Sequence, residues 1–125
     1  MNMRTERLFE SRRQFQLWRY VVSHGQLLLR SNPSSRHKSR IEVLFKGVEW
    51  LNLPTTLNGL AIYTASSDEQ KQFEAATHIN INGGLIPYIV KSKGTTSFVL
   101  ANGCWSVEEQ KDYFATSSLL IEGLK

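Results

Sequence analysis

Cysteine and long apolar runs are scarce in this chain of 125 residues. The single cysteine, Cys104, cannot form an intramolecular disulfide, which excludes the class of small secreted domains held together by disulfides. No apolar run approaches the roughly 18 to 20 residues of a membrane-spanning helix. A secretory signal peptide has an apolar core near its N-terminus. This chain instead has charged residues there, at Arg4, Glu6, Arg7 and Glu10. We therefore expect a cytoplasmic protein that does not contact a membrane.

Motifs for metal binding and catalysis are also lacking. The three histidines, His24, His37 and His78, are scattered, and no Cys-x-x-Cys or His-Glu-x-x-His pair is present. We expect neither a metal nor a cofactor, and we assign no catalytic residue. Catalytic groups can converge from distant positions, so one alternative stays open: a small enzyme with a loop-built pocket that uses His24 or His78 as acid or base.

Length and patterning predict one domain over residues 1–125 that is mainly β, in the α+β class. Residues 1–13 alternate in charge and are expected to form an N-terminal arm or a short helix. A short middle helix is expected over 68–76, and a C-terminal helix after a capping-box pattern at Ser106 and Glu109. Six to seven strands in hairpin order predict an antiparallel roll, barrel or sandwich. The strand candidates lie within 14–31, 39–46, 60–64, 79–81, 85–90 and 96–104, and residues 48–53 are a further apolar segment.

The segment 14–31 is the most informative one, because it has the pattern of a β-hairpin. Two runs of apolar and aromatic residues flank His24-Gly25, which is expected to be a two-residue turn. That turn sets a register in which Trp18, Tyr20, Val22, Leu27 and Leu29 face the core.

In the same register Arg19 lies directly opposite Arg30 on the other face, where like charges repel unless a negative group lies between them. Two sources of that negative charge are considered. Glu42, on the next strand candidate, could neutralise the pair within a solvated ion-pair ladder. Alternatively, a carboxylate or phosphate of a ligand or partner binds between the two guanidinium groups, whose geometry suits such anions.

Positive charge is concentrated in the first half of the chain. Residues 1–50 hold ten Lys or Arg against four Asp or Glu, whereas residues 51–125 hold five against seven. Much of the excess lies in or beside a basic loop over 32–39. We expect a non-enzymatic binding or interaction module that receives an acidic protein partner on this basic surface. The predicted binding residues are Arg19, Arg30, Arg36, Lys38 and Arg40.

Two further interactions are kept as alternatives. The same basic surface could bind nucleic acid, although the sequence contains no recognised nucleic-acid-binding motif. An edge strand near Pro87 could pair with a second copy of the chain and form a homodimer.

Several segments of the first half resemble small bacterial single-domain proteins of unknown function. These are Tyr20-Val21-Val22-Ser23-His24, Leu27-Leu28-Leu29-Arg30-Ser31, Ile41, Phe45-Lys46-Gly47-Val48 and Leu53-Pro54. The resemblance implies a stand-alone β-rich domain, and it transfers neither an activity nor a catalytic residue.

Overall fold

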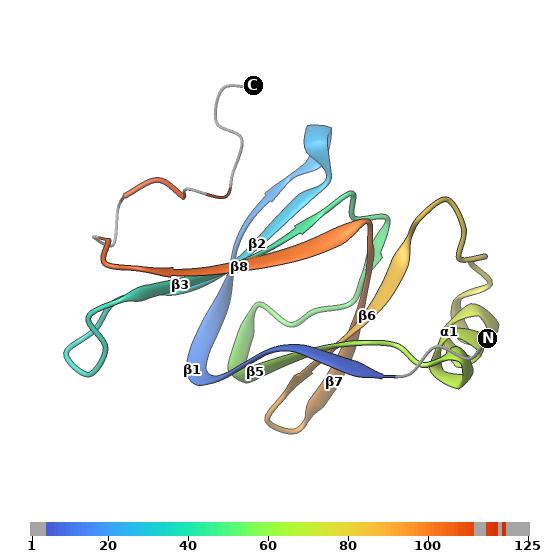
Figure 1. Ribbon diagram of the computed structural model, residues 1–125, viewed down its shortest axis with the longest axis horizontal. Helices are drawn as coiled ribbons and strands as arrows, with labels where there is room; N and C mark the ends of the chain where they lie inside the picture. The colour runs from blue at the N-terminus through green and yellow to red at the C-terminus, as the bar shows by residue number, and fades with distance from the viewer. Residues whose placement is uncertain (1–4, 112–114, 118, 120–125) are drawn as a thin grey trace.

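The computed structural model describes residues 5–111, 115–117 and 119, and these form a mainly β fold. Eight antiparallel strands make one open sheet in the order β4-β7-β6-β5-β1-β2-β3-β8, and one helix lies at an end of the molecule (Figure 1). The strands are β1 (Glu6–Val21), β2 (Gln26–Ser31), β3 (Arg40–Lys46), β4 (Trp50–Leu51), β5 (Thr56–Thr64), β6 (Ile86–Ser92), β7 (Thr95–Ala101) and β8 (Gly103–Glu109). The mainly antiparallel β class is confirmed, although the described residues form eight strands instead of six or seven. No described helix has the length and apolar character needed to cross a membrane.

The N-terminal segment is a strand, so the expected arm or short helix over 1–13 is wrong for its described part. From Glu6 onward the chain pairs with β5, and the same strand continues into the β1–β2 pair. Alternation explains this outcome. Phe9 and Phe15 point inward and stack edge to face, with ring centroids 5.9 Å apart, while Glu10 and Arg12 between them remain at the surface.

The expected C-terminal helix is also wrong where the structure describes it. Ser106 and Glu109 belong to β8, which pairs with β3 from Gly103 to Glu109. This strand satisfies the backbone groups along one side of β3, and that gain outweighs a local capping signal. Residues 115–117 and 119 are not helical either, and residues 112–114, 118 and 120–125 lie outside the described part of the chain.

The middle helix is confirmed as α1 (Ser67–Thr77). Its N-cap is Ser66, and the helix begins one residue before the expected start. The Ser66 hydroxyl accepts from the Glu69 backbone N–H, while the Glu69 carboxylate accepts from the Ser66 N–H at 2.8 Å. Phe73 anchors the helix, with its ring 5.1 Å from Trp50 and 5.6 Å from Phe98 between centroids.

The core lies on the inner face of the curled sheet. Along β2 and β3 the inner positions are Leu27, Leu29, Ile41, Val43 and Phe45, as the alternation predicts. Leu28 and Leu44 face outward and form a second, smaller cluster with Trp18, Val21 and Leu119. Both faces of β2 and β3 are therefore covered, and every residue of β2 is buried. Tyr20 and Val22 are 42 and 78% exposed, so the expectation that Trp18, Tyr20 and Val22 face the core is wrong.

The two ends of the sheet are joined by the chain itself. Strand β7 lies beside the edge strand β4, and after the single residue Asn102 the chain continues as β8, the opposite edge. The Asn102 backbone N–H donates to the Lys46 carbonyl at 2.8 Å, and its side chain packs against Gly47.

Two expectations about individual segments are wrong. Residues 79–81 form no strand. Pro87 belongs to β6, which has β5 and β7 as neighbours, so this proline does not mark an edge strand.

Candidate functional site

Arg30 and Arg19 do not face each other, which corrects the predicted register of the first hairpin. Leu17 pairs with Leu29 and Arg19 pairs with Leu28, so Trp18 is an extra residue, and Arg30 lies opposite Gln16. The turn is a 3-10 segment, η1 (Val22–His24), followed by Gly25 in the left-handed region. The bulge has a packing reason: the Trp18 ring lies against the Arg30 guanidinium, 4.5 Å from its centre to the Arg30 Cζ.

The internal partner of Arg30 is Glu42, as one of the two sequence interpretations supposed. Arg30 Nη2 and Nε both lie 2.7 Å from Glu42 Oε2, which makes a two-pronged ion pair across β2 and β3. Arg40 Nη2 lies 3.7 Å from the other carboxylate oxygen. The pair is buried, not solvated: the side chains of Arg30, Glu42 and Arg40 are 4, 2 and 1% exposed.

Residues 115–117 cover this charge network. Arg40 donates to the carbonyls of Ala115 and Thr116, and the Ser117 hydroxyl donates to Glu42 Oε1 at 2.7 Å. Every charged group of the network therefore has a protein partner. Arg30 and Arg40 act within the fold, and neither is a free surface cation.

Two adjacent arginines of β1 lie beside this network, and a bulge places them there. Ser11 pairs with Leu60 and Gln14 with Asn58, so Arg12 and Arg13 together oppose Gly59, which has a φ of +76°.

Arg13 fastens the base of the β2–β3 loop. Its guanidinium donates to the carbonyl oxygens of Ser31, Asn32 and Ser39, at 3.3, 3.2 and 2.7 Å, and to the hydroxyls of both serines. Burial lowers the pKa of Arg13, and the Glu108 carboxylate 3.9 Å away acts in the opposite direction. An arginine keeps its charge under such shifts. The charged Arg13 side chain therefore holds both ends of the β2–β3 loop by hydrogen bonds.

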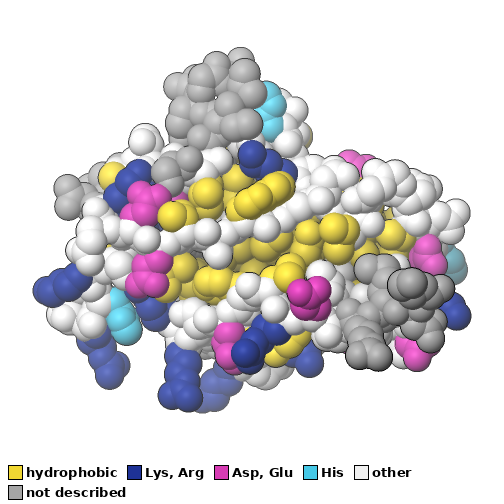
Figure 2. Space-filling view, viewed as in Figure 1, with side chains coloured by type: hydrophobic (Ala, Val, Ile, Leu, Met, Phe, Trp, Pro, Cys, Tyr) yellow, Lys and Arg dark blue, Asp and Glu magenta, His cyan; other side chains and the backbone are white. Residues whose placement is uncertain are grey.

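A basic hollow of about 410 Å³ opens between β1 and the β2–β3 loop, and we call it the loop hollow. Arg13 and Arg30 form part of its wall and are held as described above. The side chains of Arg12 and Arg36 are exposed, and neither makes a hydrogen bond or ion pair with the rest of the described chain. Lys and Arg side chains gather at the lower left of Figure 2, the end where Figure 1 places this loop. The full lining is Arg12, Arg13, Gln14, Gln16, Arg30, Ser31, Asn32, Ser34, Arg36 and His37.

The wall of the loop hollow also contains an unsatisfied acceptor. Asn32 Oδ1 is buried and accepts no hydrogen bond from the described residues. A buried polar atom without a partner is costly, and it becomes satisfied when a bound group supplies an N–H or O–H donor. The hollow thus offers two free guanidinium groups, while the Asn32 acceptor is buried behind its lining.

The structure separates the five residues predicted from the sequence. Arg36 lines the loop hollow and Lys38 is exposed in the same loop. Arg30 and Arg40 are buried in the charge network, and Arg19 is exposed away from the hollow, beside Leu28. The sequence interpretation missed Arg12 and Arg13, since residues 1–13 were expected to form an arm or a short helix, and it assigned no binding role to Gln14 and Gln16 of the expected hairpin.

The groups considered for catalysis lie far from the loop hollow. His24 ends η1 and His78 is the C-cap of α1, with a φ of +62°. Cys104 is held in β8 beside Phe45, and burial raises the pKa of its thiol to about 12, so that it is protonated at neutral pH.

No match to a known protein bears on this site. No protein family, no curated protein and no solved structure matches the chain.

Proposed function

We propose that the protein is a non-enzymatic binding module that receives an acidic protein partner in the loop hollow. The single observation that carries the proposal is the pair Arg12 and Arg36, two unpartnered guanidinium groups from different elements that line one hollow. A guanidinium offers a planar fork of donors that fits a carboxylate with two hydrogen bonds.

The surroundings of the two arginines support a peptide over a bare anion. A polypeptide brings backbone N–H groups together with its carboxylates. Gln14 and Gln16 line the hollow with side-chain amides that both donate and accept. An inorganic anion fully ionised at neutral pH offers acceptors only and would leave the amide oxygens without a donor.

The rigidity of the site favours binding as well. The loop is held at both ends by Arg13, and the β2 and β3 strands below it are locked by the Arg30–Glu42 pair. A site that is ordered before binding loses less conformational entropy when the partner arrives.

Binding of a fluorescein-labelled peptide of twelve glutamates, followed by anisotropy at several salt concentrations, tests the proposal. Arg12→Glu combined with Arg36→Glu should weaken binding by at least tenfold and reduce its salt dependence. The matched control is Arg19→Glu with Lys71→Glu, which changes the net charge equally at exposed positions outside the hollow. The control should lose less than threefold. Equal losses in both double variants, or no binding by the unaltered protein, would overturn the proposal.

A further inference from the structure

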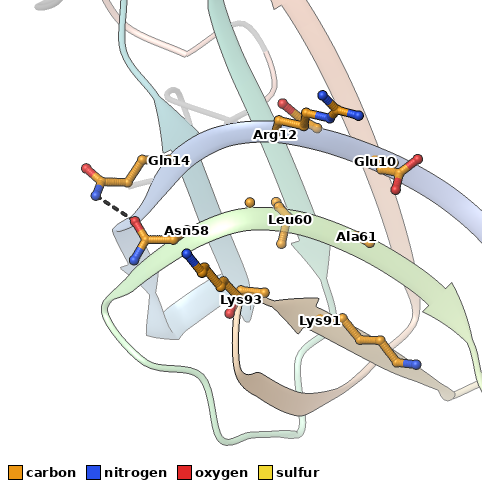
Figure 3. A pocket seen from close by; sticks show the side chains of 11 residues that line it. Glu10, Arg12, Gln14, Asn58, Leu60, Ala61, Lys91 and Lys93 are labelled. Carbon is orange, nitrogen blue, oxygen red and sulfur yellow. Dashed lines mark hydrogen bonds between the residues drawn. The ribbon is translucent and has the colours of Figure 1, made fainter.

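A second basic hollow adjoins the loop hollow on the other side of β1. It has a volume of about 430 Å³, lies over β5 and the β6–β7 turn, and is called here the strand hollow (Figure 3). Arg12 and Gln14 line both hollows, so the two share a wall on β1. The remaining lining is Glu10, Ser11, Asn58, Gly59, Leu60, Ala61, Lys91, Ser92 and Lys93.

The strand hollow carries its own positive charge. Lys91 and Lys93 are exposed and extend from β6 and the turn after it, Lys93 toward Asn58 (Figure 3). Its one carboxylate, Glu10, is paired with Arg7 at 3.0 Å. Glu10 therefore does not neutralise the two lysines. Lys91 has other partners in the chain, because its Nζ lies 5.4 Å from the centre of the Tyr63 ring and its charge acts on the Glu69 carboxylate.

A polar floor connects the two hollows. Gln14 Nε2 donates to Asn58 Oδ1 at 2.8 Å, and the Lys93 backbone N–H donates to the Asn58 carbonyl at 2.9 Å (Figure 3). These bonds join β1, β5 and the β6–β7 turn and fix the shared wall in place. Arg12 extends from this wall away from β5 (Figure 3), and it also lines the loop hollow.

We infer that the two hollows form one binding strip, and that the partner presents an extended acidic segment lying across β1 from Arg36 to Lys93. This inference rests on the proposed function and adds to it the shape of the ligand. A single acidic side chain would occupy one hollow, whereas a segment with several carboxylates fills both and gains from each.

The lining favours a polypeptide over single-stranded nucleic acid. Proteins that bind single strands combine a basic groove with aromatic rings on which the bases stack. Within residues 5–111 no Phe, Tyr or Trp lines either hollow. Side-chain amides stand there instead, and they match the donors and acceptors of a peptide backbone.

Two glutamate peptides, of four and twelve residues, test the length of the site. Extended, they span about 13 and 40 Å, so that only the longer one covers a strip of this kind. The longer peptide should bind at least tenfold more tightly than the shorter one. Lys91→Glu with Lys93→Glu should remove most of that advantage and change binding of the short peptide by less than threefold. Arg19→Glu with Lys71→Glu serves as the control of equal charge and should leave the length advantage intact.

The outcomes separate the two claims. If Arg12→Glu with Arg36→Glu weakens binding while Lys91→Glu with Lys93→Glu leaves the length advantage unchanged, the loop hollow stands and the strip is wrong. If neither double variant acts more strongly than the control, both claims fail. The same assays use a labelled strand of twelve thymidines. If this strand binds more tightly than the long peptide and loses affinity in the same variants, the ligand of the strip is nucleic acid and the inferred acidic polypeptide is wrong. Thermal unfolding of each variant checks that these exposed substitutions leave the fold intact.

Discussion

Arg30 and Glu42 form a two-pronged ion pair in the interior, with both contacts at 2.7 Å. Its position between the outer cluster and residues 115–117 gives it a structural role with measurable consequences.

Glu42→Gln should be strongly destabilising. The substitution leaves the buried guanidinium groups of Arg30 and Arg40 without a counter-charge, which typically costs about 3 to 5 kcal/mol. Urea unfolding measures the loss, and Glu10→Gln, at an exposed pair, should cost about 1 kcal/mol or less. Should Glu42→Gln fail to fold, Ser117→Ala removes one hydrogen bond to Glu42 and should cost about 1 kcal/mol. A loss no greater than that of Glu10→Gln would contradict the buried network.

Arg13→Lys should loosen the β2–β3 loop. A lysine keeps the charge but lacks the planar fork that donates to three carbonyls and two hydroxyls, so we expect a loss of about 2 kcal/mol. Hydrogen exchange should be faster at the Ser34 amide, which donates to His37 within the loop. Arg12→Lys is the control at the neighbouring position and should leave both quantities nearly unchanged. Equal protection in the two variants would mean that Arg13 does not fasten the loop.

The stability gained from Glu69 should depend on pH. Its bond from the Ser66 backbone N–H is the largest cause that lowers the Glu69 pKa below 4.5, so the folded state favours the ionised carboxylate. This contribution is present above the unfolded pKa and is lost as the pH falls through the folded one. The difference in unfolding free energy between the unaltered protein and Glu69→Gln should therefore shrink between pH 7 and pH 3. Ser66→Ala, which removes the hydroxyl cap, should cost about 1 kcal/mol at pH 7. A gap for Glu69→Gln that stays constant across this range would count against the assignment.

Gly47→Ala should cost more than Gly94→Ala. Both glycines have positive φ, +66° and +76°, which costs an alanine about 1 to 2 kcal/mol. A Cβ at Gly47 would also overlap the Asn102 side chain, whereas nothing lies within 4 Å of one at Gly94. Adding Asn102→Gly should restore part of the Gly47→Ala loss and none of the Gly94→Ala loss in thermal unfolding. Identical losses of stability in the two alanine variants would show that the Asn102 side chain moves aside at little cost in free energy.

Local patterns predicted much of the fold. The alternation in β2 and β3 placed Leu27, Leu29, Val43 and Phe45 in the core, because a half-buried strand needs that period. The helix over 68–76 was also recognised from its residues. Each of these features depends on near neighbours in the chain.

The features that the sequence did not predict depend on contacts between residues far apart in the chain. The bulge at Trp18 exists because its ring packs on Arg30, and the bulge at Arg12-Arg13 exists opposite Gly59. One extra residue in a strand shifts every later pairing, so the predicted Arg19–Arg30 contact was lost. For the same reason Arg12 was not expected beside Arg36. An Asn-Gly pair inside β5 was the one available signal of that second bulge.

The passage of the chain over Asn102 has a consequence for how the protein is made. During synthesis on the ribosome β3 emerges early, whereas β8, which pairs with its far side, is the last described strand. The β3 amide and carbonyl groups on that side therefore stay unpaired until β8 has been synthesised. We expect the β3 amides that bond to β8 to gain protection last in pulsed hydrogen-exchange refolding, because distant pairings form slowly. If they are protected as early as those facing β2, this order of assembly is wrong.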